Sequence, residues 1–166
     1  MTKVIDNFLP MEDFIVLKHI IMGHNFPFYI NSVVSHSDEK DEAWRWYATH
    51  LLYEYDFVCS DHFQTVYNLF IDKFRNEVGY KSLIRIKVNL YPHTETLKEN
   101  NPHVDYPYEH HAALFSLNTC DGFTRLKDGT KIDSVENRIV FFNGGDIHNS
   151  TTTTEKFRYN INFNWL

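Results

Sequence analysis

The strictest constraint on the fold of this chain is the alternation of side chains near its carboxyl end. From Phe157 to Trp165, every odd-numbered residue is aromatic or aliphatic and every even-numbered residue is polar. Successive side chains of a β-strand point to opposite faces, so the pattern predicts a strand with one apolar face. Arg158 lies on the polar face, and a guanidinium inside a barrel is costly unless it has a partner. A β-rich fold whose polar strand face has a function is therefore predicted.

A second alternating stretch and several shorter ones extend this pattern over the carboxyl-terminal half. Ile84, Ile86, Val88 and Leu90 alternate with Arg85, Lys87, Asn89 and Tyr91, and further strands are expected at 112–118, 122–126, 131–135, 138–143 and 157–165. Turn-like pairs stand between them at 121–122, 128–129 and 144–145. Many short antiparallel strands indicate a sandwich or jelly roll.

Helices are predicted only in the first half of the chain. A short helix is expected from Met11 to Met22, ended by Gly23, and an extended segment at 26–34 precedes a polar loop at 35–42. A longer helix is expected from 61 to 78, with Asp61 and Gln64 in a capping box and Gly79 at its end. Its apolar stripe, which should pack on a sheet, consists of Phe63, Val66, Tyr67, Phe70, Ile71 and Phe74.

The length of 166 residues fits a single domain, 1–166, in which 1–80 form helical support and amino-terminal strands and 81–166 form the jelly-roll core with the metal site. With 43% hydrophobic residues and two distant cysteines, the chain is expected to be a globular cytoplasmic protein without disulfides. No stretch approaches the roughly 20 apolar residues that span a bilayer, so no membrane partner is expected. The net charge of −6 gives no reason to expect a nucleic-acid partner.

Two histidines and one aspartate stand in an order that suits a metal site. His103 and Asp105 are two residues apart, so on an extended backbone both side chains point to the same side. His148 follows the expected strand 138–143, where a jelly roll brings it opposite that pair. Two imidazoles and one carboxylate on one face of an iron ion leave adjacent positions open for a bidentate cosubstrate and dioxygen. The alternative is a solvated loop pair, because the chain has ten histidines.

Arg158 follows His148 and supplies a rigid fork of donors for a carboxylate. Two other groups are interpreted structurally. His110 and His111 are adjacent, so on a strand they cannot both reach one ion. The cluster 44–47, Trp-Arg-Trp-Tyr, is interpreted as packing rather than as a platform for substrate.

On these motifs the chain resembles the 2-oxoglutarate and Fe(II)-dependent oxygenases, in particular small phage and bacterial members of the prolyl 4-hydroxylase-like branch. The resemblance runs from about Ile84 to Trp165, and the opening residues 4–10 are also similar. The motifs that carry it are, in order, 90–92, 103–107, 115–118, 121–124, 137–142, His148 and 157–159. Residues 23–80 carry no motif of the family.

The resemblance implies a mainly β fold with flanking α-helices, built on a double-stranded β-helix (jelly-roll, cupin-like) core with one long and one short amino-terminal helix. It implies that His103, Asp105 and His148 bind iron and are the catalytic residues, and that Arg158 pairs with the distal carboxylate of 2-oxoglutarate. Fe(II), 2-oxoglutarate and dioxygen are the cofactors and cosubstrates that follow, with ascorbate as a candidate reductant.

Four further residues are assigned to the cosubstrate pocket by the same resemblance. Tyr91 matches a tyrosine that lines it, and Asn118 matches a frequent asparagine. Asn162 lies on the same inward strand face as Arg158. Ser116 departs from the family, because relatives carry there a tyrosine that helps hold the distal carboxylate; the serine hydroxyl or a water is expected to take that role.

The implied activity is an oxidoreductase, a dioxygenase that hydroxylates a C–H bond of a peptidyl proline or another protein side chain, with succinate and CO₂ as coproducts. Two alternatives stay open. One is a cupin-like metal enzyme or small-molecule oxygenase that does not use 2-oxoglutarate, against which Arg158 argues. The other is a noncatalytic jelly-roll binding module. The expected partner is a protein, peptide or small-molecule substrate, in the cytoplasm of a host cell if a phage encodes the chain.

Overall fold

The computed structural model describes residues 2–34 and 42–166, so almost all of the loop predicted at 35–42 lies outside the described residues. Its elements in chain order are β1 (Lys3–Ile5), α1 (Met11–Ile21), β2 (Tyr29–Asn31), β3 (Tyr47–Glu54), β4 (Phe57–Val58), α2 (Phe63–Glu77), β5 (Leu83–Tyr91), β6 (His111–Ser116), β7 (Phe123–Leu126), β8 (Lys131–Asp133), β9 (Arg138–Asn143), β10 (His148–Ser150) and β11 (Arg158–Trp165). The prediction of a mainly β chain with two flanking helices is confirmed.

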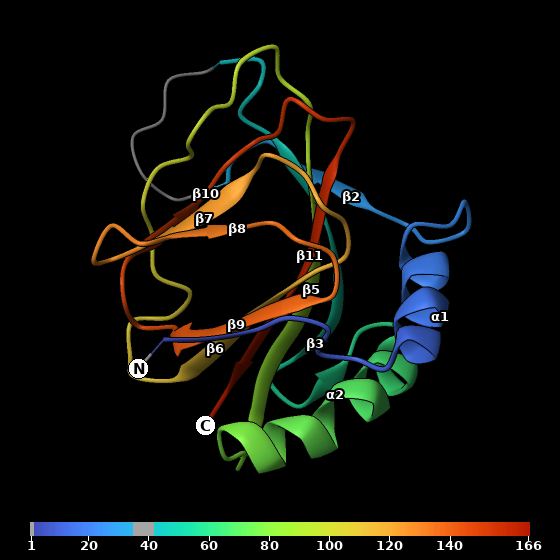
Figure 1. Ribbon diagram of the computed structural model, residues 1–166. Coiled ribbons are helices and arrows are strands. Elements are labelled where there is room, and N and C mark those ends of the chain that lie inside the picture. The colour runs from blue at the N-terminus through green and yellow to red at the C-terminus, as the bar shows by residue number, and fades with distance from the viewer. Residues whose placement is uncertain (1, 35–41) are drawn as a thin grey trace.

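The strands form two antiparallel sheets. The larger sheet has the order β1-β9-β6-β11-β5-β3-β2, with β4 paired to β3, and the smaller has the order β10-β7-β8. Figure 1 shows α1 and α2 against one face of the larger sheet and the smaller sheet over the opposite face. Strand β11 therefore lies in the middle of the larger sheet, between β6 and β5, with helices on one side and strands on the other.

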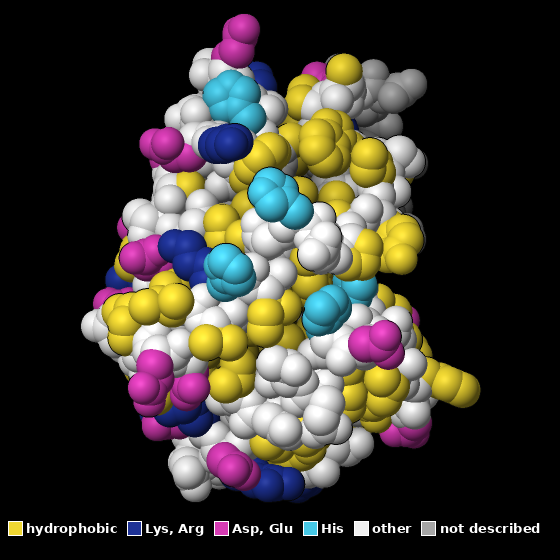
Figure 2. Space-filling model, turned by 90° about the vertical axis from the view of Figure 1, so that its right-hand side faces the viewer, with side chains coloured by type: hydrophobic (Ala, Val, Ile, Leu, Met, Phe, Trp, Pro, Cys, Tyr) yellow, Lys and Arg dark blue, Asp and Glu magenta, His cyan; other side chains and the backbone are white. Residues whose placement is uncertain are grey.

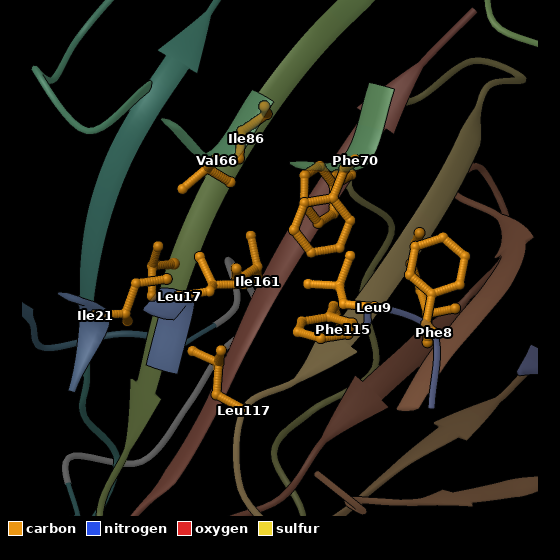
Figure 3. Close-up of a cluster of buried hydrophobic side chains, with 14 of the residues drawn as sticks. Phe8, Leu9, Leu17, Ile21, Val66, Phe70, Ile86, Phe115, Leu117 and Ile161 are labelled. Atoms are coloured by element: carbon orange, nitrogen blue, oxygen red, sulfur yellow. The ribbon is translucent and has the colours of Figure 1, made fainter. Parts of the chain in front are cut away.

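The odd-numbered residues of β11 explain why the helices pack where they do. Ile161, Phe163 and Trp165 join a core with the stripe of α2, of which Val66, Phe70 and Phe74 are buried. Figure 3 shows Phe70, Phe115, Ile161 and neighbouring side chains of this cluster, drawn from both helices and several strands. The expected packing of the α2 stripe on a sheet is confirmed.

The even-numbered residues of β11 point the other way, into the space between the two sheets. Arg158, Asn160, Asn162 and Asn164 are all at most 4% exposed. A second, smaller apolar cluster shares this space and includes Ala112, Leu126, Val140 and Phe142. One side of the interior between the sheets is thus apolar and the other is lined with amides and a guanidinium.

Helix ends differ from the expectation at one point. The capping box of Asp61 and Gln64 is wrong: α2 begins after His62, which makes no side-chain capping bond. The Gln64 amide instead donates to Asn68 at 2.7 Å. Gly79, with φ +75°, follows the helix in a left-handed conformation that glycine adopts readily, which agrees with its predicted role as terminator.

The first helix has apolar residues on more than its core face. Phe14, Leu17 and Ile21 are buried, whereas Met11, Ile15 and Val16 are more than half exposed. On the face of the molecule shown in Figure 2, hydrophobic side chains are interspersed with charged and uncharged polar ones. Neither helix of the described chain is long and apolar enough to cross a membrane.

Strands outside the predicted core region complete the larger sheet. β3 and β5 pair over most of their length, and β1 pairs with β9 at the other edge. The amino-terminal 80 residues thus supply strands of the same sheet as well as both helices. The extended segment expected at 26–34 contains the short strand β2, and the short strand β10 was not predicted.

Candidate metal centre

His103, Asp105 and His148 come together in the space between the two sheets. The backbone N–H of each histidine donates to the carbonyl of the other at 2.9 Å, an isolated bridge that sets β10 beside the 103–105 segment. Their ring centroids are 4.7 Å apart. One possible ligand atom from each of the three residues lies within 4.8 Å of the others, and within residues 2–34 and 42–166 no other group of three such side chains is this close.

The carboxylate of Asp105 is held by three donors. Its Oδ1 accepts from Nη2 of Arg85 at 2.7 Å, and its Oδ2 accepts from the amides of Asn164 at 2.8 Å and Asn162 at 3.2 Å. Burial alone would raise the pKa of Asp105, but the positive charge of Arg85 holds it well below its usual range. Asp105 is therefore an oriented carboxylate at neutral pH.

The two histidine rings lie side by side, with centroids 4.7 Å apart. Nδ1 of His148 lies 3.0 Å from the carbonyl oxygen of Asp146, so the N–H on Nδ1 donates there and Nε2 is the ring nitrogen left for a metal. Burial, together with neighbouring His148, lowers the pKa of His103 to about 4. Metal binding requires neutral imidazoles, so His103 is in the correct state at pH 7.

Arg158 lies at the other end of the same strand face and contacts only neutral acceptors. Its Nε donates to Ser134 at 2.8 Å, Nη2 to Thr124 at 2.9 Å and Nη1 to the carbonyl of Thr151 at 3.2 Å. These three bonds leave two of the five guanidinium N–H groups without an acceptor among the described residues. Burial lowers the pKa of Arg158, but an arginine stays charged in proteins.

The packing around Arg158 explains the glycine at position 122. A Cβ at Gly122 would lie 2.6 Å from Cδ of Arg158 and 2.8 Å from the carbonyl oxygen of Thr152. A side chain would fit there only if both the arginine and the backbone of Thr152 moved. The 121–122 turn therefore sets the place of the guanidinium.

The other predicted pocket residues differ in whether they contact Arg158 or Asp105. Tyr91 is buried beneath Arg158, whose guanidinium carbon lies 5.1 Å from the ring centroid, and Asn162 contacts Asp105. Ser116 is opposite Asn160 on the inward face, but the hydroxyls that contact Arg158 are those of Ser134 and Thr124. The side chain of Asn118 bonds to the backbone of Phe157 and Tyr159 at 2.8 Å each, which fixes the start of β11.

Arg85 and Lys87 are site residues that the sequence analysis did not assign. Both lie on the polar face of β5, directly opposite Asn164 and Asn162 of β11. Lys87 borders the cavity between the sheets together with His103 and Asp105. The signal was available in the alternation of 83–91, but alternation gives the face of a side chain and not its contact with Asp105.

The pair His110 and His111, interpreted as structural, has contacts of that kind. His110 is buried, with Nδ1 2.8 Å from the carbonyl of Tyr108 and Nε2 3.2 Å from the amide of Asn164. His111 stacks on Trp165 with ring centroids 5.5 Å apart. Neither histidine belongs to the group of metal-ligating side chains.

The cavity that borders the three ligands is small, about 30 Å³. A larger one, about 380 Å³, is lined by Leu126, Phe142, Ile147 and several polar or charged residues, and the ring of Phe142 meets that of His148 edge-on. Small-molecule sites usually have roughly 300–1,000 Å³, so an organic diacid beside Asp105 requires the lining side chains to move. We assign the site to the small cavity because it has the donor set.

The donor set fits a divalent iron ion. Two neutral imidazoles and one carboxylate, converging within 4.8 Å, are the ligands of a facial iron site with open positions. Buried Arg158, without a carboxylate from the described chain, fits an anionic organic ligand on the same strand face. The arrangement can hold a metal at one end and an acid at the other.

Comparison with solved structures finds the same fold in several enzymes. A prolyl-4-hydroxylase from Pseudomonas putida is 15% identical over 99% of this chain and 91% of that one, with a TM-score of 0.64. A prolyl hydroxylase from Trichoplax adhaerens, in complex with a peptide fragment of the hypoxia inducible factor oxygen degradation domain, is 16% identical over 99% and 83%, with a TM-score of 0.69. The epimerase SnoN in complex with Fe³⁺, alpha ketoglutarate and nogalamycin RO is 10% identical over 99% and 78%, also with a TM-score of 0.69.

No protein-family model and no curated protein matches the sequence. At such low identities the structural likeness shows the fold: the chain is a double-stranded β-helix of the kind found in 2-oxoglutarate-Fe(II) oxygenases, as the sequence predicts.

Proposed function

We propose that this chain is an Fe(II)- and 2-oxoglutarate-dependent dioxygenase that hydroxylates a C–H bond and releases succinate and CO₂. One observation carries the proposal: the His103–Asp105–His148 donor set lies against the polar face of β11, which also carries Arg158, a buried cation without a carboxylate from the described chain. The first suits Fe(II), and the second suits the distal carboxylate of 2-oxoglutarate. Solved oxygenases with the same fold support this reading.

Each residue then has a defined task. Bound Fe(II) would supply the activation of dioxygen that oxidation of a C–H bond requires. His103, Asp105 and His148 would hold it on one face, and Arg158 would orient the cosubstrate through its distal carboxylate. Arg85 would keep the Asp105 carboxylate ionised and in place.

Tyr91 and the neighbouring hydroxyls would complete the cosubstrate end of the pocket. Burial raises the pKa of the Tyr91 phenol, which keeps it a hydrogen-bond donor at neutral pH. Thr124 and Ser134 hold Arg158 through its Nη2 and Nε. We assign these two residues the positioning of Arg158; the role proposed for Ser116, to hold the distal carboxylate of 2-oxoglutarate, is a different one and stays a prediction.

For the substrate, we propose a protein side chain, with peptidyl proline as the first class to test. The Pseudomonas putida and Trichoplax adhaerens proteins are described as prolyl hydroxylases, and the second was solved with a peptide. The SnoN complex contains nogalamycin RO, so small molecules form the second class to test.

The test is iron-dependent formation of succinate from 2-oxoglutarate under air, with ascorbate as reductant. We expect turnover by the wild type and by His93→Ala, a histidine bonded to the backbone of Glu155, and at least a 100-fold loss in His148→Ala. Iron-dependent turnover of a substrate without any need for 2-oxoglutarate would favour a cupin-like enzyme. Unchanged turnover in His148→Ala would refute the assigned ligands, and no turnover with any metal would favour a binding module.

A further inference from the structure

Lys87 is a cation inside the site that the proposed chemistry does not use. It lies on β5 opposite Asn162, and its side chain borders the same cavity as His103, Asp105 and His148. Its Nζ lies 5.5 Å from the ring centroid of Tyr47. Tyr47 stacks on Tyr91 at 5.8 Å, and Tyr91 lines the same cavity as Lys87.

The ammonium of Lys87 has no anionic partner within residues 2–34 and 42–166. Arg85, its neighbour on the same face, is paired with Asp105 at 2.7 Å. Asp105 and Glu54 act on Lys87 only through their charges, without a hydrogen bond to it, and Oε1 of Glu54 accepts from the hydroxyl of Tyr106 at 2.9 Å. Burial and the charge of Arg85 lower the pKa of Lys87 to about 8, which leaves the ammonium mostly protonated at pH 7.

With metal and cosubstrate bound, the charged groups of the site would sum to a net charge of one positive unit. Three cations, Arg85, Lys87 and Arg158, face the two carboxylates of Asp105 and Glu54. A divalent metal and a dianionic cosubstrate cancel each other. An unpaired charge in a partly buried site is unfavourable, so a ligand with one negative charge would be stabilised there.

The cosubstrate itself is the less suitable partner for Lys87. Tyr91, which lies under Arg158, is four residues from Lys87, or roughly 13 Å along an extended strand. Asp105 bonds to Asn162 and Asn164, at the Lys87 end of that face. A diacid that chelates the metal and reaches Arg158 extends away from Lys87, which stays free for another anion.

We propose that Lys87 binds a carboxylate of the substrate and thereby selects acidic substrates. This inference rests on the proposed function. The carboxylate belongs either to a free acid, such as an amino acid, or to an acidic residue of a peptide. In both cases the carboxylate must be close to the carbon that is oxidised, because Lys87 borders the same cavity as the metal ligands.

The experiment measures binding to the protein loaded anaerobically with Fe(II) and 2-oxoglutarate, through the change in its visible charge-transfer band. The probes are free L-amino acids and their carboxamides, and N-acetylated dipeptide amides that contain aspartate or asparagine. Wild type is compared with Lys87→Met and Lys87→Arg. The matched control is Lys73→Met on α2, which removes a lysine whose Nζ lies 5.6 Å from the Phe8 ring centroid, in the helix layer.

We expect at least one acid to bind 10-fold or more tightly than its amide in wild type and in Lys73→Met. Lys87→Met should abolish this preference, Lys87→Arg should retain part of it, and the 2-oxoglutarate Kd should change less than 2-fold. The probe set that shows the preference identifies the source of the carboxylate.

Two results would overturn the inference alone: an acid preference that survives in Lys87→Met, or a band in wild type without any preference for acids. A 2-oxoglutarate Kd that rises as much in Lys87→Met as in Arg158→Met would also overturn it, because Lys87 would then bind the cosubstrate. No band in the wild type would overturn the proposed function together with the inference.

Discussion

Asp105 depends on Arg85 more than on any other single residue. The pair is buried, with side chains 6% and 11% exposed, and removal of one partner from a buried pair typically costs about 3–5 kcal/mol. We expect Arg85→Met to lower the free energy of unfolding of the metal-free protein by about 3 kcal/mol, measured with urea. Adding Asp105→Asn should recover part of the loss.

The control for this cycle is Arg75→Met, which removes an exposed pair with Asp72 on α2. Exposed pairs contribute about 0–1 kcal/mol, so little should change. If the two arginine variants lose equal stability, or if Asp105→Asn adds its full cost to that of Arg85→Met, the ion pair does not stabilise the site.

His103 should make the metal-free protein less stable in mild acid. The unfolded chain takes up a proton at this histidine near pH 6.5, whereas the folded protein does so only near its lowered pKa of about 4. Stability is therefore lost as pH falls between these values, by about 2 kcal/mol at pH 5. Asp105, whose pKa is lowered, contributes stability above the unfolded pKa of a carboxyl and loses it only at lower pH.

The measurement compares urea unfolding at pH 7 and pH 5 in wild type and His103→Gln. The pKa of His50 is also lowered by burial, so only the difference between the two proteins reports on His103. The same pH dependence in both proteins would mean that His103 is not kept neutral by the fold.

Replacement of Arg158 should weaken binding of the cosubstrate and leave binding of the metal unchanged. Arg158→Met keeps much of the side-chain volume but removes the charge, so the Kd for 2-oxoglutarate should rise at least 10-fold, with Fe(II) affinity within 2-fold of wild type. Arg125→Met, at an exposed pair with Glu99, serves as control. If isothermal titrations show equal losses of affinity for the metal and for the cosubstrate, Arg158 is a structural residue.

The sequence contained the order of these residues but not their contacts. His103, Asp105, His148 and Arg158 were assigned from spacing and family likeness, and the structure brings the first three together beside β11, which carries buried Arg158. The contacts of Arg85 with Asp105 and of Ser134 with Arg158 join residues 20 and 24 positions apart. Such contacts depend on strand register and packing, which a single sequence does not specify.

At the scale of elements, α2 and β11 depend on the same aromatic cluster. Phe70 is 1% exposed and its ring centroid lies 4.6 Å from that of Phe163 and 5.0 Å from that of Phe115. Phe70→Ala should destabilise the protein by about 3–5 kcal/mol in thermal or urea unfolding. Phe57→Ala, at a ring that is 74% exposed, should change stability by less than about 0.5 kcal/mol. Similar losses in both would contradict this description of the core.

Elements with a clear hydrophobic period or flanking turn signals were predictable, and others were not: strand β3 was missed although it has eight residues. The stripe of α2 and the alternation of β11 follow directly from period, because each repeats over several residues. Strand β10 has three residues, His148–Ser150, and exists because it pairs with β7 and with His103. The capping box failed for a related reason, since a two-residue signal is easily overridden by local packing.

At the scale of the molecule, the candidate site requires the whole fold. Its residues come from β5, the 103–105 segment, β7, β10 and β11, so both sheets must assemble before the ligands converge. A metal at free concentration c that binds only the folded chain raises the free energy of unfolding by RT ln(1 + c/Kd), that is, with the logarithm of its concentration once Kd is exceeded. Metal binding and global folding should therefore be linked.

We propose that the space between the two sheets holds Fe(II) and 2-oxoglutarate together. The most direct test is an anaerobic titration of the metal-free protein with Fe(II) and then 2-oxoglutarate, followed through the visible metal-to-ligand charge-transfer band. We predict a saturable band in wild type and in the surface variant Asp72→Ala, and none in Asp105→Ala. Iron binding without a band in wild type, or an unchanged band in Asp105→Ala, would contradict the claim.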